Sequence, residues 1–113
     1  MAEWRETELV VGIDLGTTNS VIAYWDRDRP RVYKPYHDSF LLPSVVFREP
    51  DGGWVVGRVA QRNRALHPSR VFRSLKRHLW DPEFRAIVAG VEYTPAQLSA
   101  QILAKLQEIA QAA

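Results

Sequence analysis

The sequence predicts an α/β protein built from a small β meander, a peripheral subdomain and a carboxy-terminal helix. Two patterns predict this class. The first half of the chain carries short apolar runs rich in β-branched residues and separated by turn residues, which is typical of strands. The last part carries a single apolar stripe at helical spacing. With 113 residues, the chain is long enough for one small domain.

The first strands are predicted to form an antiparallel meander, which we assign to residues 9–41. Leu9–Ile13 is almost continuously apolar, which indicates a strand buried on both faces. Val21–Trp25 resumes the β pattern, and Arg31–Tyr36 alternates polar and apolar side chains. We expect the first two strands to pair antiparallel, with Gly16–Asn19 at their shared end.

A peripheral subdomain is expected over residues 42–93, and it begins with a hairpin. Ser44–Arg48 and Gly53–Val56 both have strand character, and they flank the turn sequence EPDG.

Two short helices are predicted to follow this hairpin. The spacing of Val59, Ala60, Ala65 and Leu66 suits a helix that ends at His67-Pro68, because the residue before proline is pushed out of the helical region. Ser69 is expected to cap a second helix, with Phe72, Leu75 and Leu79 on one face. The pattern of residues 83–93 does not distinguish a helix from a strand.

The carboxy-terminal helix has the clearest start signal in the chain. Thr94 is a predicted N-cap, Pro95 suits the first helical position and Gln97 completes a capping box. One apolar stripe follows, formed by Leu98, Ile102, Leu106 and Ile109. We expect residues 94–113 to pack back on the meander.

Composition and charge exclude several classes of protein. The chain is 46% hydrophobic and 25% charged, with a net charge of +2, so its charge gives no indication of nucleic-acid binding. No apolar run is long enough to span a membrane. The charged start MAEWRETE has no apolar signal region and the chain has no cysteine, so we expect a cytoplasmic location and no disulfide.

Two further side-chain patterns have ordinary structural interpretations. Arg70, Arg73 and Arg77 would share one face of the second predicted helix, where a solvated surface is favoured over a site for an acidic partner. Trp25, Trp54 and Trp80 are expected to be half-buried packing residues, and Trp4 lies near the amino terminus.

The turn Gly16-Thr17-Thr18-Asn19 is the strongest candidate binding site. Consecutive backbone N–H groups in such a turn can form a concavity for phosphate oxygens, and the hydroxyls of Thr17, Thr18 and Ser20 add donors. Asp14, expected to be buried at the end of the first strand, could hold Mg²⁺ directly or through water. The residue types alone leave a second interpretation open, in which Asp14 caps its own turn and the threonines serve as β formers.

Lys76, in VFRSLKRHLW, is the second candidate. Its ordinary role would be to extend along an apolar surface with its ammonium in water. A role in phosphate binding requires the fold to bring it to the Asp14 turn.

Five segments, in this order and spacing, resemble the start of the seventy-kilodalton heat-shock chaperones of the DnaK type. They are VVGIDLGTTNSVIAYW, LLPSVVF, VVGRVAQRNRALHP, VFRSLKRHLW and VEYTPAQLSAQILAKLQEIA, and they cover nearly the whole chain after residue 8. The first segment is shared in looser form with actins and sugar kinases, and the later segments make the resemblance specific. The chain departs from the family in HLWDP, where a glycine is usual, and in a short stretch before the last helix, where a hairpin is expected to be reduced or absent.

This resemblance implies an actin-like ATPase (ribonuclease H-like) fold and a set of roles. Asp14 would orient a Mg²⁺-bound water, and Gly16, Thr17, Thr18 and Asn19 would line the first phosphate loop for ATP or ADP. Lys76 would approach the γ-phosphate and the attacking water. The chain would be the amino-terminal part of a nucleotide-binding domain, whose second phosphate loop, adenosine pocket and peptide-binding domain would lie beyond residue 113.

The implied parent function is ATP-driven protein folding under stress, with unfolded peptide clients and cochaperones as partners. The isolated chain is expected to be inactive, and the exposed edge of its incomplete sheet favours self-association. An alternative is that the chain is part of a bacterial actin-like shape protein that forms filaments. The Lys76-Arg77 pair favours the chaperone over this alternative. A sugar kinase would not explain LPSVV, and a binding module for acidic partners would rest on the arginines alone.

Overall fold

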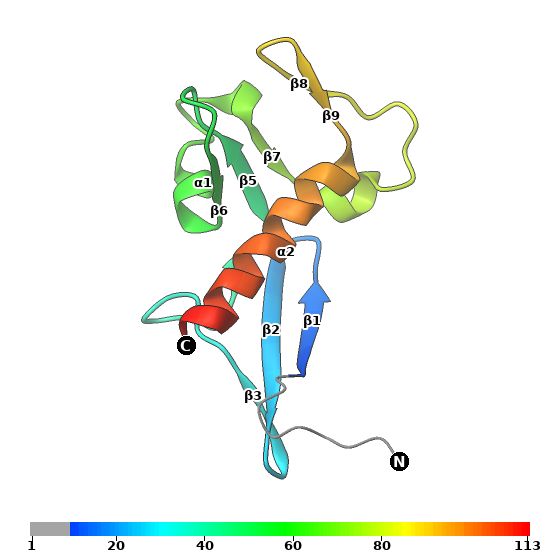
Figure 1. Ribbon diagram of the computed structural model, residues 1–113. Coiled ribbons are helices and arrows are strands. Elements are labelled where there is room, and N and C mark those ends of the chain that lie inside the picture. Colours follow the sequence, from blue (N-terminus) through cyan, green and yellow to red (C-terminus); the bar gives the residue numbers. More distant parts are fainter. Residues whose placement is uncertain (1–9) are drawn as a thin grey trace.

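The computed structural model describes residues 10–113, which form three antiparallel sheets and two α-helices (Figure 1). The strands are β1 (Val11–Leu15), β2 (Asn19–Asp26), β3 (Arg29–Val32), β4 (Leu42–Pro43), β5 (Val45–Arg48), β6 (Trp54–Val56), β7 (Val71–Arg73), β8 (Ala86–Val88) and β9 (Val91–Tyr93). The helices are α1 (Arg58–Arg62) and α2 (Pro95–Ala112), with 3₁₀ turns η1 (Pro68–Arg70) and η2 (Leu75–His78).

The meander forms as predicted, with β2 between β1 and β3. β1 and β2 pair antiparallel from Val11↔Tyr24 to Leu15↔Ser20, so the Gly16–Asn19 turn joins their ends. The expectation that the first strand is buried on both faces is wrong: β1 lies at the sheet edge, and Ile13 is 44% exposed. Leu9, the first residue of the predicted strand, lies outside the described residues.

The peripheral sheet has the order β6-β5-β7 and confirms the predicted hairpin. The backbone N–H of Glu49 donates to the carbonyl of Gly53 at 2.8 Å and closes the EPDG turn. β5 runs through the middle of this sheet, and both of its faces are covered. Val46 is buried in the core cluster that contains α2, and Val45 and Phe47 are buried in a second cluster with Ala60 of α1.

The first short helix is confirmed as α1, and it ends earlier than expected, at Arg62. The second predicted helix is wrong. Its sequence instead forms η1, strand β7 and η2, because Val71–Arg73 pairs with β5 and satisfies its backbone groups in the sheet. Ser74 then adopts a left-handed conformation with φ of 56°, which an α-helix cannot contain.

Two side-chain predictions fail with that helix. Arg70, Arg73 and Arg77 do not share a helical face, because they lie in η1, β7 and η2. Trp54 is half-buried as expected, whereas Trp25 is 61% and Trp80 is 93% exposed. Trp4 lies outside the described residues.

The unassigned segment forms a short hairpin of β8 and β9, so the hairpin expected to be reduced or absent is present with three residues in each strand. Ala89 and Gly90 make its tight turn, with φ of 51° and 80°. The rings of Trp54 and Tyr93 meet edge to face at a centroid distance of 5.1 Å and connect β9 to β6.

Helix α2 begins with the predicted capping box. The Gln97 N–H donates to the Thr94 hydroxyl at 3.1 Å, and the Thr94 N–H donates to the Gln97 side chain at 2.9 Å. Leu98, Ile102 and Leu106 are each at most 1% exposed. They pack in one core cluster with Ile22 of the meander and Val46 of the peripheral sheet, so α2 connects the two sheets.

Candidate functional site

The β1–β2 turn approaches its own backbone so closely that residue 16 has no room for a side chain. A Cβ atom at Gly16 would lie 2.2 Å from the backbone oxygen of Asn19. Real Cβ atoms essentially never come within 3.0 Å of such an atom. The tight turn therefore requires the glycine of the GTTN sequence.

Ser44 holds the turn in place from a distant part of the chain. Its hydroxyl donates to the Gly16 carbonyl at 2.9 Å, and its backbone N–H donates to the Thr18 carbonyl at 2.9 Å. The hydroxyls of Ser20 and Ser44 are 2.8 Å apart, and both residues are buried. The LPSVV segment thus has a direct structural connection to the candidate site.

Sequence reasoning missed this contact and counted Ser20 among the ligand-facing hydroxyls. The structure corrects that count, because Ser20 is completely buried and its hydroxyl binds Ser44. The only signal in the sequence was a serine next to apolar residues in each of two predicted strands, which does not by itself predict a pair.

The remaining polar groups of the turn are available to a ligand. No hydrogen bond among residues 10–113 uses the backbone N–H groups of Gly16, Thr17 and Thr18. Thr18 is exposed, and Thr17 and Asn19 are half-buried. Their side chains take no part in the side-chain hydrogen bonds formed within the described residues. Consecutive free N–H groups beside hydroxyls suit an anion with several oxygens.

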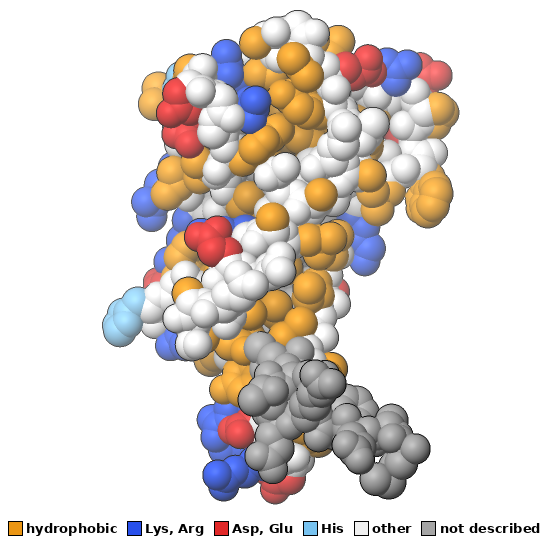
Figure 2. All heavy atoms as spheres, in the orientation of Figure 1, with side chains coloured by type: hydrophobic (Ala, Val, Ile, Leu, Met, Phe, Trp, Pro, Cys, Tyr) orange, Lys and Arg blue, Asp and Glu red, His pale blue; other side chains and the backbone are white. Residues whose placement is uncertain are grey.

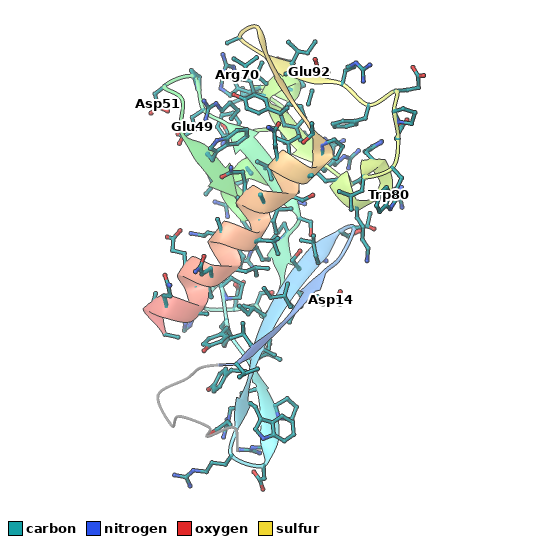
Figure 3. All side chains as sticks on the ribbon, turned by 45° about the vertical axis from the view of Figure 1, so that its right-hand side comes forward. Asp14, Glu49, Asp51, Arg70, Trp80 and Glu92 are labelled. Carbon is teal, nitrogen blue, oxygen red and sulfur yellow. The ribbon has the colours of Figure 1, made fainter. Side chains whose placement is uncertain are left out.

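Asp14 is exposed, and the expectation that its carboxylate is buried is wrong. The side chain points away from α2, on the outer face of the sheet, because successive residues of β1 alternate between the faces (Figure 3). Within residues 10–113 there is no group of three acidic or histidine side chains that could hold a metal ion. Asp14 could contribute one carboxylate to a Mg²⁺ site, which would need further oxygen ligands such as water and phosphate.

Lys76 lies in η2, and η2 lies beside the β1–β2 turn (Figures 1 and 3). Leu75 is 2% exposed and anchors η2 in the core, whereas Lys76 next to it is exposed. The fold thus brings the segment of Lys76 to the same end of β1 as Asp14 and the turn. That the Lys76 ammonium faces the same side of the molecule as Asp14 stays a prediction.

Other polar clusters have structural explanations. Arg58 donates to the Asp38 carboxylate at 2.6 Å, and this hydrogen bond is the main cause that lowers the pKa of Asp38. The Arg58 guanidinium also lies 4.1 Å from the ring centroid of Tyr36, whose hydroxyl accepts from the Arg58 N–H. Together these contacts fix the start of α1. Arg70 similarly donates to the carbonyls of Arg48 and Glu49.

The chain matches the protein family described as Hsp70 protein over residues 10–82. The chain belongs to the Hsp70 family. It is 42% identical over 113 residues to the chaperone protein DnaK of Thermotoga neapolitana, and this alignment covers 99% of the chain and 18% of the relative. The DnaK proteins of Thermotoga petrophila and of Thermotoga sp. strain RQ2 show the same identity and coverage.

Membership of the Hsp70 family confirms the resemblance and the actin-like ATPase fold. The chain spans about a fifth of the length of these DnaK relatives and corresponds to the amino-terminal part of the nucleotide-binding domain. Family membership argues against the filament-forming shape protein and the sugar kinase. No helix among residues 10–113 is long and apolar enough to cross a membrane.

Proposed function

We propose that this chain supplies the first phosphate-binding loop of an Hsp70 nucleotide-binding domain and the lysine that acts on the γ-phosphate. The N–H groups of residues 16–18 and the side chains of Thr17, Thr18 and Asn19 would contact the β- and γ-phosphates of ATP or ADP. Asp14 would hold a water of the bound Mg²⁺. Lys76 would neutralise charge that develops during phosphoryl transfer. The observation that carries this proposal is the Gly16 turn, with its unused N–H groups beside exposed Asp14 and η2.

The residues that fit Mg²⁺-ATP all approach from one side. The two open grooves that flank α2, about 420 and 700 Å³, are lined by residues other than the turn. Phosphoryl transfer needs a nucleotide held from both sides. We therefore propose that the isolated chain binds Mg²⁺-ATP only at about millimolar concentration and does not turn it over.

The complete parent protein would couple this ATPase to the binding of unfolded peptides, and cochaperones would be further partners. It would act in the cytoplasm. These activities are part of the same proposal, and the isolated chain is expected to show no chaperone activity. The matches to DnaK chaperones support it.

Titration of the ¹⁵N-labelled chain with Mg²⁺-ATP tests the proposal. We expect amide shifts concentrated at residues 14–19 and 74–77, with a dissociation constant of about 1 mM, and no phosphate release above the buffer rate. Asp14→Asn should weaken the Mg²⁺-dependent part of the shifts. Asp28→Asn is the matched control, because Asp28 is an exposed aspartate in the turn at the other end of β2.

Two results would contradict this proposal. One is a set of shifts confined to residues outside the turn and η2. The other is micromolar binding with turnover that Asp14→Asn abolishes, which would show that this chain assembles a complete site.

A further inference from the structure

Ser44 lies where the chain crosses from the meander to the peripheral sheet. It follows β4, which pairs with β2, and it precedes β5, the central strand of the peripheral sheet. Leu42 and Val46, on either side of it, are at most 1% exposed and belong to the core cluster with α2. Hydrophobic side chains border α2 in the space-filling view (Figure 2). Packing therefore fixes the backbone of Ser44 independently of the β1–β2 turn.

The hydrogen bonds of Ser44 have a definite direction. A serine hydroxyl has one proton to donate, and a carbonyl oxygen can only accept. Because the Ser44 hydroxyl lies 2.9 Å from the Gly16 carbonyl oxygen, its proton is used there. The 2.8 Å hydrogen bond between the hydroxyls of Ser20 and Ser44 must then be donated by Ser20. The bonds run from Ser20 to Ser44 to Gly16, and the first strengthens the second by polarisation.

The bond to Gly16 sets the direction of the next N–H group along the chain. Across a planar trans peptide, the C=O of one residue and the N–H of the following residue point in opposite directions. No cis peptide occurs among residues 10–113. Ser44 holds the Gly16 carbonyl toward itself, so the Thr17 N–H points away from Ser44. That N–H group has no hydrogen-bond partner among the described residues.

Ser44 also fixes a second peptide of the turn. Its backbone N–H donates to the Thr18 carbonyl at 2.9 Å, and this bond orients the peptide between Thr18 and Asn19. The turn needs such restraints, because glycine has more backbone freedom than other residues. A side chain that would limit this freedom at Gly16 is excluded by the Asn19 oxygen. The restraint therefore comes from a residue outside the turn.

We propose that Ser44 is a positioning residue for phosphate binding. Its two hydrogen bonds to the turn aim the Thr17 N–H at an oxygen of the bound phosphate. Ser20 acts one step further away, because it orients the Ser44 hydroxyl. This inference rests on the proposed function of the turn and gives a role in it to a buried residue that does not itself touch the ligand.

Two variants of almost equal shape isolate the contribution of the hydroxyl. Ser44→Thr keeps a hydroxyl, whereas Ser44→Val has a methyl group in its place, so both add similar bulk to the buried site. The ¹⁵N-labelled chains are titrated with Mg²⁺-ATP, and the dissociation constant is measured from the amides of residues 14–19. We expect Ser44→Val to bind about fivefold more weakly than Ser44→Thr, which is a usual effect of one lost hydrogen bond. The Thr17 amide of Ser44→Val should also be shifted before nucleotide is added.

A second comparison adds no bulk to the core. Ser99 in α2 is also a buried serine, 5% exposed, and its hydroxyl has no hydrogen-bond partner within residues 10–113. Ser44→Ala should weaken Mg²⁺-ATP binding about fivefold, and Ser99→Ala should leave it unchanged. Ser20→Ala should cause a smaller loss than Ser44→Ala, because the bond from Ser44 to Gly16 remains. This comparison decides the question if the added bulk unfolds the first two variants.

Two results would overturn this inference alone, in a wild-type chain whose turn amides respond to Mg²⁺-ATP. They are equal affinities of Ser44→Thr and Ser44→Val, and equal effects of Ser44→Ala and Ser99→Ala. A wild-type chain whose turn amides do not respond to Mg²⁺-ATP would overturn the proposed function together with this inference. The wild-type titration thus distinguishes the two failures.

Discussion

Replacing Gly16 with alanine is expected to destabilise the chain by about 2–3 kcal/mol and to displace the β1–β2 turn. The added Cβ would lie 2.2 Å from the Asn19 oxygen, and a backbone atom cannot move aside as a flexible side chain could. The turn would have to open, which would also strain the hydrogen bonds from Ser44 to Gly16 and Thr18. Urea unfolding of the variant and the wild-type chain measures the change in the free energy of unfolding.

Gly12→Ala is the matched control for this prediction. Gly12 lies on the same strand, and a Cβ atom there would meet no heavy atom within 4 Å. Its free energy of unfolding should change by less than about 0.5 kcal/mol. Equal losses from the two alanine substitutions would show that the close approach at Gly16 does not determine the turn.

Leu98→Ala should reduce the free energy of unfolding by about 3 kcal/mol, which is a large part of the margin of a small domain. Leu98 is completely buried in the core cluster that joins α2 to both sheets. The substitution removes apolar contacts and leaves a cavity that a packed core fills only in part. Chemical unfolding monitored by circular dichroism measures the loss.

Leu103→Ala is the control on the same helix, because Leu103 is 40% exposed. It should cost less than about 1 kcal/mol, because little of its apolar surface is removed from water on folding. A similar loss for both variants would contradict the assignment of the buried face of α2.

The sequence predicted the elements whose signals are local. The capping box at Thr94 and the turn-bounded strands of the meander rest on neighbouring residues, and both formed. The helix expected after Ser69 did not form, because the pairing of β7 with β5 overrides the apolar spacing of Phe72 and Leu75. Such pairing depends on residues more than twenty positions away.

The candidate site shows the same division. The glycine, the threonines and Asp14 are candidates that one short segment of sequence proposes, and the fold brings η2 with Lys76 beside them. The Ser20–Ser44 contact was missed, because its two residues are 24 positions apart and neither is unusual alone. The exposure of Asp14 was also missed, since its side chain lies on the face of β1 away from α2, and this face is exposed rather than buried.

The central claim is that Asp14 and Lys76 of this chain act on a bound nucleotide, and a chimera tests it most directly. The corresponding segment of full-length Thermotoga neapolitana DnaK, which is 42% identical, would be replaced by these 113 residues. Single-turnover ATP hydrolysis by the folded chimera is then measured. We expect Lys76→Ala to slow hydrolysis by about 100-fold or more and Asp14→Asn to reduce its Mg²⁺ dependence, whereas Lys34→Ala, at another exposed lysine, has no effect. An active chimera in which Lys76→Ala and Asp14→Asn both hydrolyse ATP as fast as Lys34→Ala would contradict the account.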